Sequence, residues 1–386
     1  MSTTLVITND FPPRQGGIET FVHAVVTRMP GNVVVYTSRE PGMEAYDRTL
    51  PFPVVRDPAR TLLPTPRVTR RAAGLLREHG CDRVWFGAAA PLAFMAPDLR
   101  RAGARRMVAT THGHEIWWAR TPGARQVMRR IGDHVDVVTY LGEYTRARLV
   151  SALGPRARLS RLAPGVDAGE FRPDGSAARR SAVRQRHGIG EDRKVVLCAA
   201  RLVPRKGQDT LIRALPRLLR DVPDAVLLVV GRGPDEQRLR KLARGLPAGT
   251  VVFAGGRDHA EMAGYYAAAD VFAMPCRTRK GGLEAEGLGI VFLEAQASGL
   301  PVIVGDSGGA PDTVRHGGNG RVVDGRDVAA VADAVGSALR APDREARGEA
   351  GRRWGAQEWA WESSVRHLTD LLAAEGDRDG PRAATP

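Results

Sequence analysis

Short apolar runs alternate with amphipathic segments along almost the whole chain, and they do so in two separate series. The apolar runs are rich in valine, which is typical of strands that are buried within a sheet. The first series comprises TLVITN, NVVVYTS, DRVWFGAA, RMVATTH and VDVVTYL, and the second comprises KVVLCAARL, AVLLVVG, TVVFAGG, DVFAMP, LPVIVGD and NGRVVD. Segments such as IETFVHAVVTRM and DTLIRALPRLLRDV lie between them and predict helices. This alternation predicts parallel sheets that are covered by helices on both faces.

A stretch without periodicity separates the two series. LAPGVDAGEFRPDGSAARR is interrupted by glycine and proline, and we place the linker there, around residues 164–180. A chain of 386 residues is also too long for one ordinary core. We therefore expect an α/β protein of two doubly wound, Rossmann-like domains that face a cleft, at residues 1–168 and 169–353. A tryptophan-bearing helix at 354–374 and a disordered tail at 375–386 complete the prediction.

The net charge of +14 and the isoelectric point near 10.6 are typical of proteins that bind anionic partners, including nucleic acids. Arginine far outnumbers lysine, however, and a GC-rich genome explains that bias better than selection for phosphate contacts. Two cationic clusters, Arg100–Arg106 and Arg125–Gly132, lie in the N-terminal half. They predict attraction to an anionic surface such as a membrane, or else an ordinary solvated face, and the sequence leaves both readings open.

Three widely separated cysteines, Cys81, Cys198 and Cys276, fit a reducing compartment and argue against a disulfide framework. The sequence contains no apolar run long enough to span a membrane and no visible signal peptide before the first strand. We therefore expect a cytoplasmic protein.

Ligands of doubly wound sheets bind at the turns that follow the carboxyl ends of the strands. After the first predicted strand, Gly16 and Gly17 come just before a helix, where free amides can bind an anion; a tight turn is the equal alternative. THGHE follows another strand and contains His112, His114 and Glu115. These three residues predict a metal site, a histidine that polarises a hydroxyl or carbonyl group, or a capping histidine without chemistry, and the metal pattern is the weak one.

A cationic turn, ARLVPRKGQD, follows the first strand of the second series. The strand ends at Arg201, Lys206 follows, and a helix begins near Asp209. A solvated loop is the bland alternative. A guanidinium and an ammonium group beside helix N-terminal amides suit a diphosphate, and the position at a strand end favours that reading.

The most informative stretch is GGLEAEGLGIVFLEAQASG, in which seven residues separate Glu286 from Glu294. IVFLEAQASG predicts a helix that contains Glu294, whose carboxylate can accept hydrogen bonds from a ribose diol. Glu286 lies in the preceding loop and can reach a sugar ring. Gly287 and Gly289 expose backbone amides that can hold a phosphate.

Together these motifs resemble those of the retaining GT-B glycosyltransferases of family 4. GGIE, ARLVPRKG, the two spaced glutamates and GLPVIVGDSGGAPD occur in the order of that family, and the resemblance extends from Leu5 to about Leu372. The strings VWFGAAAPLAFMA, THGHE and FAMPCRTRKGGLEAEGLGIVFLEAQASG are similar to those of the actinobacterial phosphatidylinositol-mannoside mannosyltransferases. One mild departure is Asp312 in GGAPD, where the wider family more often carries glutamate.

The resemblance implies that GDP-mannose is the donor and that the second domain binds most of it. Arg201 and Lys206 would neutralise the leaving diphosphate, and Glu294 would hold the ribose. Glu286 would act as a catalytic residue that positions the donor sugar. It would do so together with the backbone amides of Gly287, Leu288, Gly289 and Ile290.

The resemblance also implies roles for the first domain. Gly16 and Gly17 would close over the phosphates, and His112, in preference to His114, would contact the donor sugar near the reacting carbon as a second catalytic residue. Retention without an evident nucleophile implies front-face displacement, in which the departing phosphate helps to deprotonate the acceptor. Fixed cations serve the leaving group, so no metal is required, and assistance by Mg²⁺ stays open.

The acceptor that the resemblance implies is a lipid-linked mannoside, phosphatidylinositol monomannoside, at an anionic membrane surface. The protein would then be peripheral to the inner face of the cell membrane. A first alternative keeps the enzyme class and changes the substrates to another nucleotide sugar and a soluble acceptor. A second alternative, of another class, is a basic nucleic-acid-binding protein, although no nucleic-acid motif is recognised. The sequence leaves the oligomeric state open.

Overall fold

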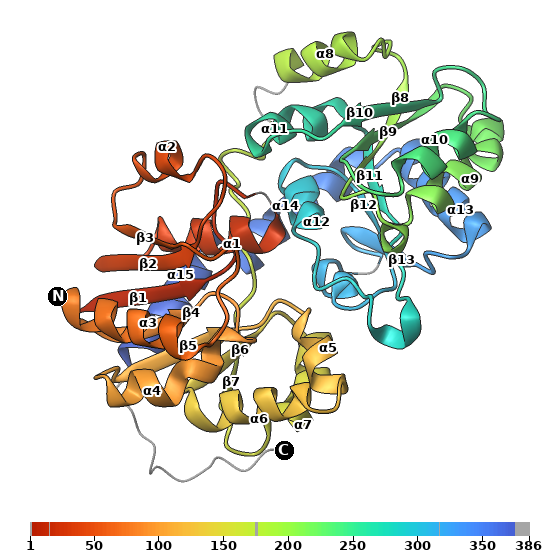
Figure 1. Cartoon of the computed structure of the whole chain (residues 1–386). Helices are drawn as coiled ribbons and strands as arrows, with labels where there is room; N and C mark the ends of the chain where they lie inside the picture. Colours follow the sequence, from red (N-terminus) through yellow and green to blue (C-terminus); the bar gives the residue numbers. More distant parts are fainter. Residues whose placement is uncertain (1, 15, 174–176, 316, 375–386) are drawn as a thin grey trace. The chain divides into compact units, whose positions relative to one another are not determined.

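The computed structural model describes residues 2–14, 16–173, 177–315 and 317–374. The predicted disordered tail therefore lies outside the described residues. The chain divides into two compact units, and the first comprises the chain up to Ala163 together with the chain from Trp361 on. The second unit is Pro164–Ala360. Figure 1 shows that each unit contains its own twisted sheet with helices around it.

The first unit contains a seven-stranded parallel sheet in the order β3-β2-β1-β4-β5-β6-β7. Its strands are β1 (Thr3–Thr8), β2 (Asn32–Ser38), β3 (Val54–Asp57), β4 (Cys81–Phe86), β5 (Arg106–Thr110), β6 (Val137–Tyr140) and β7 (Leu159–Arg161). Every residue of β1 is buried because β2 and β4 flank it and helices cover both faces. The strand order reverses between β1 and β4, which makes the end of β1 the switch point of this sheet.

The helices of the first unit are α1 (Gly17–Val26), α2 (Met43–Asp47), α3 (Pro66–Glu78), η1 (Leu92–Met95), α4 (Ala96–Arg101), α5 (Glu115–Arg120), α6 (Ala124–His134), α7 (Glu143–Leu153) and α15 (Trp361–Ala373). The start of α3 illustrates the local cause. The Thr65 hydroxyl accepts a hydrogen bond from the Val68 amide, and Pro66 occupies the first helical position, where its missing N–H costs nothing.

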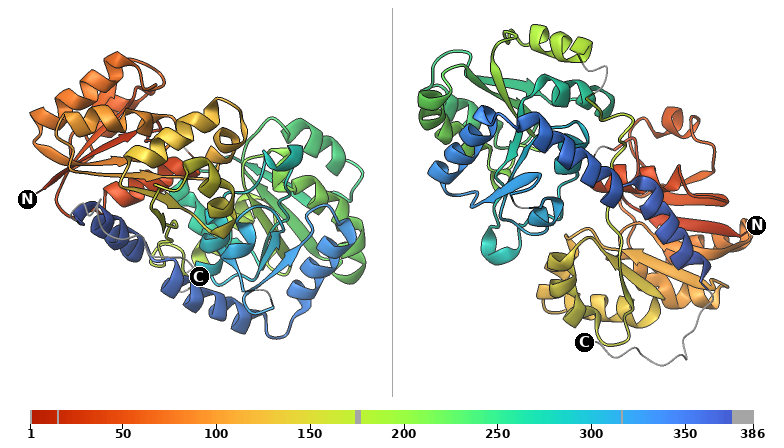
Figure 2. Two further views of the ribbon diagram at one scale, coloured as in Figure 1. Left: turned by 90° about the horizontal axis from the view of Figure 1, so that it is seen from below. Right: turned by 180° about the vertical axis from the view of Figure 1, so that it is seen from behind.

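α15 comes from the far end of the chain and packs against β4, β5 and α1 of the first unit (Figure 2). Leu368 is fully buried there, and Trp361 lies 5.8 Å from Phe21, measured between ring centroids. The buried Arg106 side chain donates from Nε to the Leu371 carbonyl oxygen at 2.7 Å. One face of the first sheet is therefore covered by residues that follow the second unit in sequence.

The second unit contains a six-stranded parallel sheet in the order β10-β9-β8-β11-β12-β13. Its strands are β8 (Lys194–Ala199), β9 (Ala225–Val230), β10 (Val251–Gly255), β11 (Val271–Met274), β12 (Val302–Gly305) and β13 (Gly320–Val323). Its helices are α8 (Ala177–Arg186), η2 (Pro204–Lys206), α9 (Gln208–Asp221), α10 (Glu236–Ala243), α11 (His259–Ala268), η3 (Lys280–Gly282), α12 (Ile290–Ala297), η4 (Ala310–Thr313), α13 (Val328–Arg340) and α14 (Arg344–Glu358). The strand order reverses between β8 and β11, so the end of β8 is the switch point.

The prediction of two doubly wound α/β domains is confirmed. All six strands of the second series and all five of the first are present, and the sequence missed only β3 and β7. Both are edge strands, and most of their residues are only partly buried, so they lack the continuous apolar run that marks an inner strand.

The expected single helix at 354–374 is two helices, α14 and α15, with a break after Glu358. The Val166 amide donates to the Trp359 carbonyl oxygen at 2.7 Å, and Val166 pairs with Ala360 in an isolated parallel bridge. This pairing takes the Trp359 backbone out of helical geometry. Trp354 and Trp359 consequently pack together in the second unit, whereas Trp361 packs in the first.

Within the described part of the chain, no helix combines the length and the apolarity needed to cross a membrane.

Candidate functional site

The cationic turn of the second unit follows β8 at the switch point of its sheet. Arg201 is exposed, and no acidic side chain among the described residues lies within ion-pair distance of it. Lys206 ends the 3₁₀ turn η2, and Gly207 then adopts a φ of +78° as the N-cap of α9. A Cβ at Gly207 would lie 2.0 Å from the Pro275 carbonyl oxygen, so only glycine allows the turn to approach the end of β11 this closely.

That close approach brings Lys206 to Glu286. Lys206 Nζ lies 2.7 Å from Glu286 Oε2, and the two side chains are 12% and 9% exposed. The two groups form an ion pair, but the angles between them do not satisfy those of a hydrogen bond. Oε2 has no other hydrogen-bond partner. Glu286 therefore retains a buried acceptor oxygen beside a fixed cation.

The loop SGGAPD holds the backbone of Glu286 in place. The Gly309 amide donates to the Glu286 carbonyl oxygen at 3.0 Å, and the Ser307 hydroxyl accepts from the Glu286 amide at 3.3 Å. Gly308 has a φ of +62°, and a Cβ there would lie 1.9 Å from the Glu286 carbonyl oxygen. The glycines of this loop therefore fix Glu286 by direct backbone contact. Asp312, in the following turn η4, is exposed.

The start of α12 offers backbone donors. Gly289 is its N-cap with a φ of +93°, and no side chain caps the helix. Among the described residues, no acceptor receives a hydrogen bond from the backbone amides of Gly287, Leu288, Gly289 and Ile290. A helix start with free amides attracts an anionic group, because the helix dipole and the N–H groups act in the same direction.

Glu294 lies one turn into α12 and is 6% exposed. Tyr266 on α11 donates from its hydroxyl to Glu294 Oε2 at 2.7 Å. Burial raises the pKa of Glu294, while the Tyr266 hydrogen bond and the nearby His259 partly oppose that rise. The structure thus brings Lys206, Glu286, the four free amides and Glu294 to the carboxyl end of one sheet, with Arg201 in the same turn as Lys206.

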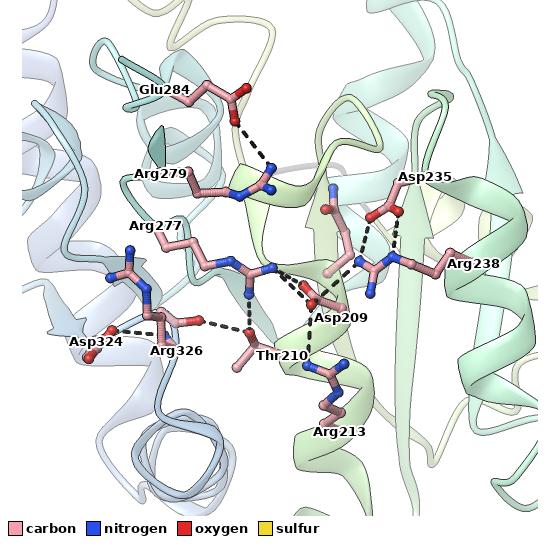
Figure 3. Close-up of polar contacts among 12 residues, drawn as sticks. Asp209, Thr210, Arg213, Asp235, Arg238, Arg277, Arg279, Glu284, Asp324 and Arg326 are labelled. Carbon is pink, nitrogen blue, oxygen red and sulfur yellow. Dashed lines mark hydrogen bonds and ion pairs between the residues drawn. The ribbon is translucent and has the colours of Figure 1, made fainter. Parts of the chain in front are cut away.

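Sequence reasoning missed a network beside this turn, centred on Asp209 (Figure 3). Arg277 donates from one nitrogen to both carboxylate oxygens of Asp209, at 2.8 and 2.9 Å, and from another to the Thr210 hydroxyl at 2.8 Å. Arg238 and Arg213 lie 3.5 Å from Asp209 Oδ2. Burial alone would raise the pKa of Asp209, but Arg277 and the other two cations lower it below its usual value. The network ties α9 to the loop after β11, and only the cations in CRTRKGG could have signalled it.

The glycine pair of the first unit lies at the switch point after β1. Gly16 is the N-cap of α1 in extended geometry, and Gly17 begins the helix. A Cβ at Gly16 would lie 2.2 Å from Glu19 Oε2, and Arg14 Nε lies 3.0 Å from Glu19 Oε1. Burial raises the pKa of Glu19, although its backbone hydrogen bond and Arg14 oppose the rise. A carboxylate therefore adjoins the glycine pair, which the sequence argument for phosphate binding did not take into account.

His112 follows β5 and is held by the carbonyl group at the end of β4. Its Nε2 lies 2.7 Å from the Gly87 carbonyl oxygen. Because a carbonyl group only accepts, Nε2 must carry the proton, and in the neutral ring Nδ1 is then an acceptor. No described residue occupies Nδ1. Burial lowers the pKa of His112, so the neutral ring is favoured, although Glu115 partly offsets the effect.

In THGHE the loop is capped by the carboxylate of Glu115. Its fully buried Oε2 accepts from the His112 amide at 2.9 Å and from the Gly113 amide at 3.1 Å. His114 Nε2 lies 3.3 Å from Glu115 Oε1. Across the described residues, no group of three or more histidine, cysteine or acidic side chains could hold a metal ion.

The two basic clusters differ in their contacts. Arg106 is buried against α15, and Arg100 binds the buried Asp136, so much of the first cluster stabilises the first unit. In the second cluster Arg125, Arg129 and Arg130 are exposed on α6. Only this second cluster presents a row of exposed cations on one helix.

Comparison with known proteins identifies the class to which these features belong. A model described as Glycosyltransferase Family 4 matches residues 15–170, and one described as Glycosyl transferases group 1 matches residues 179–354. The chain belongs to the family 4 glycosyltransferases, with a group 1 module in its second half. The predicted enzyme class is thereby confirmed.

Two relatives match almost the whole chain. The GDP-mannose-dependent alpha-(1-6)-phosphatidylinositol monomannoside mannosyltransferase of Mycobacterium tuberculosis is 51% identical over 97% of this chain and 99% of its own length. The GDP-mannose-dependent monoacylated alpha-(1-6)-phosphatidylinositol monomannoside mannosyltransferase of Corynebacterium glutamicum is 47% identical over 96% and 98%. The predicted resemblance to actinobacterial enzymes of this kind is confirmed.

A solved structure shares the fold. Anabaena Alr3699/HepE, solved in complex with UDP, matches with a TM-score of 0.79 over 97% of this chain and 100% of that chain, at 19% identity. The predicted GT-B fold is therefore confirmed.

Proposed function

We propose that this chain is a retaining mannosyltransferase that moves mannose from GDP-mannose to phosphatidylinositol monomannoside. The observation that carries the proposal is the 51% identity to the M. tuberculosis enzyme of that name, over 97% of this chain and 99% of the relative.

The second unit would bind the donor. Arg201 and the free amides at the start of α12 would receive the diphosphate, and Lys206 would add a cation that Glu286 already holds in position. Groups fixed before the substrate arrives need little reorganisation as charge develops on the leaving diphosphate. Glu294 would accept a hydrogen bond from the ribose, and the unpartnered oxygen of Glu286 would accept one from a sugar hydroxyl.

The first unit would supply His112, whose Nδ1 can accept a hydrogen bond from the donor sugar. Gly16 and Gly17 would approach the phosphates through their backbone, and Arg14 would offset the carboxylate of Glu19 there. In front-face displacement the departing phosphate takes the proton of the acceptor hydroxyl. His112 therefore needs to position the sugar and does not need to remove a proton.

The acceptor would reach the enzyme from an anionic membrane surface at the inner face of the cell membrane. Arg125, Arg129 and Arg130 on α6 are exposed cations, and each cation near such a surface contributes about 1 kcal/mol. The donor site in the second unit would not need to touch the membrane for this attraction to operate.

The test is transfer of radiolabel by the purified protein from GDP-mannose into phosphatidylinositol monomannoside in liposomes, with labelled UDP-glucose in parallel. The expected product is a lipid with one more mannose, formed only from the guanine nucleotide. The Lys206→Ala variant is the matched control, because it should leave the lipid acceptor without an added mannose.

Two results would separate the parts of the proposal. Transfer from UDP-glucose and not from GDP-mannose would overturn the donor. Label in a soluble sugar acceptor, with none in the lipid, would overturn the acceptor and favour the alternative in which the same enzyme class acts on a soluble substrate.

A further inference from the structure

The carboxylate of Glu294 has two different oxygens. Oε2 is occupied, because the Tyr266 hydroxyl donates to it at 2.7 Å. Oε1 receives no hydrogen bond from the described residues, and His259 Nδ1 lies 3.9 Å away, within ion-pair range and beyond hydrogen-bond range. Oε1 is therefore the oxygen that no described side chain uses, and it offers a ligand hydroxyl a free acceptor.

His259 lies between two carboxylates. Its Nε2 is 3.8 Å from Glu170 Oε2, on the opposite side of the ring from Glu294. The ring of Phe171 lies edge-on to His259 at 5.5 Å and to Tyr266 at 5.6 Å, measured between centroids. These contacts link a loop, α11 and α12 around one acidic side chain.

The other charged or titratable groups near this cluster lie on or next to α11 and on β8. Asp258 and Glu261 form a capping box at the start of that helix, and Arg257 Nη1 lies 4.0 Å from Glu261. Cys198 on β8 is near the Tyr266 hydroxyl and is buried. Among the described residues, His259 is the basic side chain that lies within ion-pair distance of the buried carboxylate.

We propose that Tyr266 and His259 are positioning residues for the donor nucleotide: Tyr266 holds Oε2 of Glu294, and His259 faces the same carboxylate from 3.9 Å, so that Oε1 is presented to a ribose hydroxyl. The inference rests on the proposed function, because it assumes that Glu294 binds the donor ribose. An ionised acceptor forms a hydrogen bond roughly twice as strong as a neutral one, so ionisation of this buried group matters for affinity.

Loss of either partner should weaken recognition of the ribose hydroxyls specifically. Tyr266→Phe keeps the ring contacts with Phe171 and Phe272 and removes only the hydroxyl. Without that hydrogen bond the carboxylate can rotate, and its pKa rises. His259→Gln removes the side chain that lowers the pKa of Glu294, so Glu294 takes up a proton at a higher pH than in the wild type. Donor affinity should then fall at a higher pH as the solution is acidified.

The measurement is calorimetric binding of GDP and of 2′,3′-dideoxy-GDP to the full chain. We expect the wild type to prefer GDP by about tenfold or more, the scale of a hydrogen bond to a charged group. Tyr266→Phe should lose most of that preference, and His259→Gln should lose it at a higher pH than the wild type does as the solution is acidified. In turnover, both variants should raise the KM for GDP-mannose and change kcat by less than about twofold, since uniform binding is lost.

Tyr265→Phe is the matched control. Tyr265 is the adjacent buried tyrosine of α11, and its hydroxyl lies 3.0 Å from His187 Nε2, away from Glu294. This variant should retain the preference for GDP, while a general loss of α11 packing would lower the thermal midpoint of both tyrosine variants equally. His259 is half-exposed, so its variant should fold even where Tyr266→Phe does not.

Unchanged discrimination between GDP and its dideoxy form in folded Tyr266→Phe and His259→Gln would overturn the inference and leave the proposed function intact. Failure of the proposed function has a different signature. If the wild type binds UDP and not GDP, the proposed donor is wrong, and the same comparison with UDP and dideoxy-UDP still decides the inference, because both nucleotides carry the ribose diol.

Discussion

Lys206 and Glu286 form an ion pair, with Nζ 2.7 Å from Oε2, although they are far apart in sequence and were expected to bind different parts of the donor. The pair fixes both side chains before any ligand binds. Substitution of either residue also removes the charge that faces the other. The effects of the two substitutions therefore cannot be interpreted independently.

Substitution of this pair should separate activity from stability. Lys206→Ala and Glu286→Ala should each lower turnover at least about 10²-fold, the scale for loss of one preorganised group. Lys206→Ala also leaves a buried carboxylate without its cation, which should destabilise the protein more than removing both residues. Activity assays and thermal unfolding of the two single variants and of the double variant would measure both effects. Near wild-type turnover in both single variants would show that the site is assigned wrongly.

Gly207, the N-cap of α9, should be irreplaceable for a steric reason in addition to its left-handed backbone. Gly249 has a similar φ of +75° and nothing within 4 Å of its Cβ position, so Gly249→Ala should cost only the left-handed strain, about 1–2 kcal/mol. Gly207→Ala adds a clash with the Pro275 carbonyl oxygen, so its loss of unfolding free energy should be clearly larger. Urea unfolding of both variants checks this. Equal losses would mean that the contact with Pro275 imposes no constraint.

The imidazole of His112 should stay neutral in mildly acidic solution. Burial lowers its pKa from the ordinary value, so near about pH 6, where an exposed histidine is mostly charged, this ring should carry a proton on Nε2 and none on Nδ1. The unfolded chain takes up the proton that the folded ring refuses, so this group lowers the folding stability as the pH falls below about 6.5. Histidine nitrogen NMR, assigned with His112→Asn, reports the tautomer directly. An imidazolium signal for His112 at that pH contradicts the assignment.

Chelation should leave transfer running. In the proposed function, Arg201, Lys206 and the free amides of α12 would supply positive charge to the leaving diphosphate, which is the role that a metal ion takes in many phosphoryl-transfer enzymes. We expect the initial rate in EDTA to stay within about twofold of that in Mg²⁺, a difference well under 1 kcal/mol in the barrier. A large drop that Mg²⁺ restores would show that the fixed cations are insufficient.

The sequence predicts the inner strands and the strand-end motifs well, because both depend on local patterns. β8 and β9 are essentially continuous apolar runs. Gly207 and Gly289 have a positive φ, and a glycine just before a helix indicates such a turn from the sequence alone. The edge strand β3 is only partly buried over most of its length, so nothing in its pattern separates it from a loop.

The pairings within the site could not be predicted, because they join residues that are distant in sequence. No local sequence pattern shows that Lys206 pairs with Glu286 or that Arg277 pairs with Asp209. Nor does one show that the hydroxyl of Tyr266 donates to Glu294. The protonated nitrogen of His112 likewise depends on the carbonyl of Gly87, on a different strand. Such pairings are decided by how close the backbones come in the folded chain.

The placement of α15 has a consequence for how the protein is made. A ribosome completes the second unit, which is one continuous stretch, before it releases the helix that covers one face of the first sheet. The first unit therefore begins synthesis first and finishes folding last, with the surface around Phe21 uncovered until Trp361 arrives. We expect nascent chains stalled before that point to contain a finished second unit and a first unit that binds chaperones.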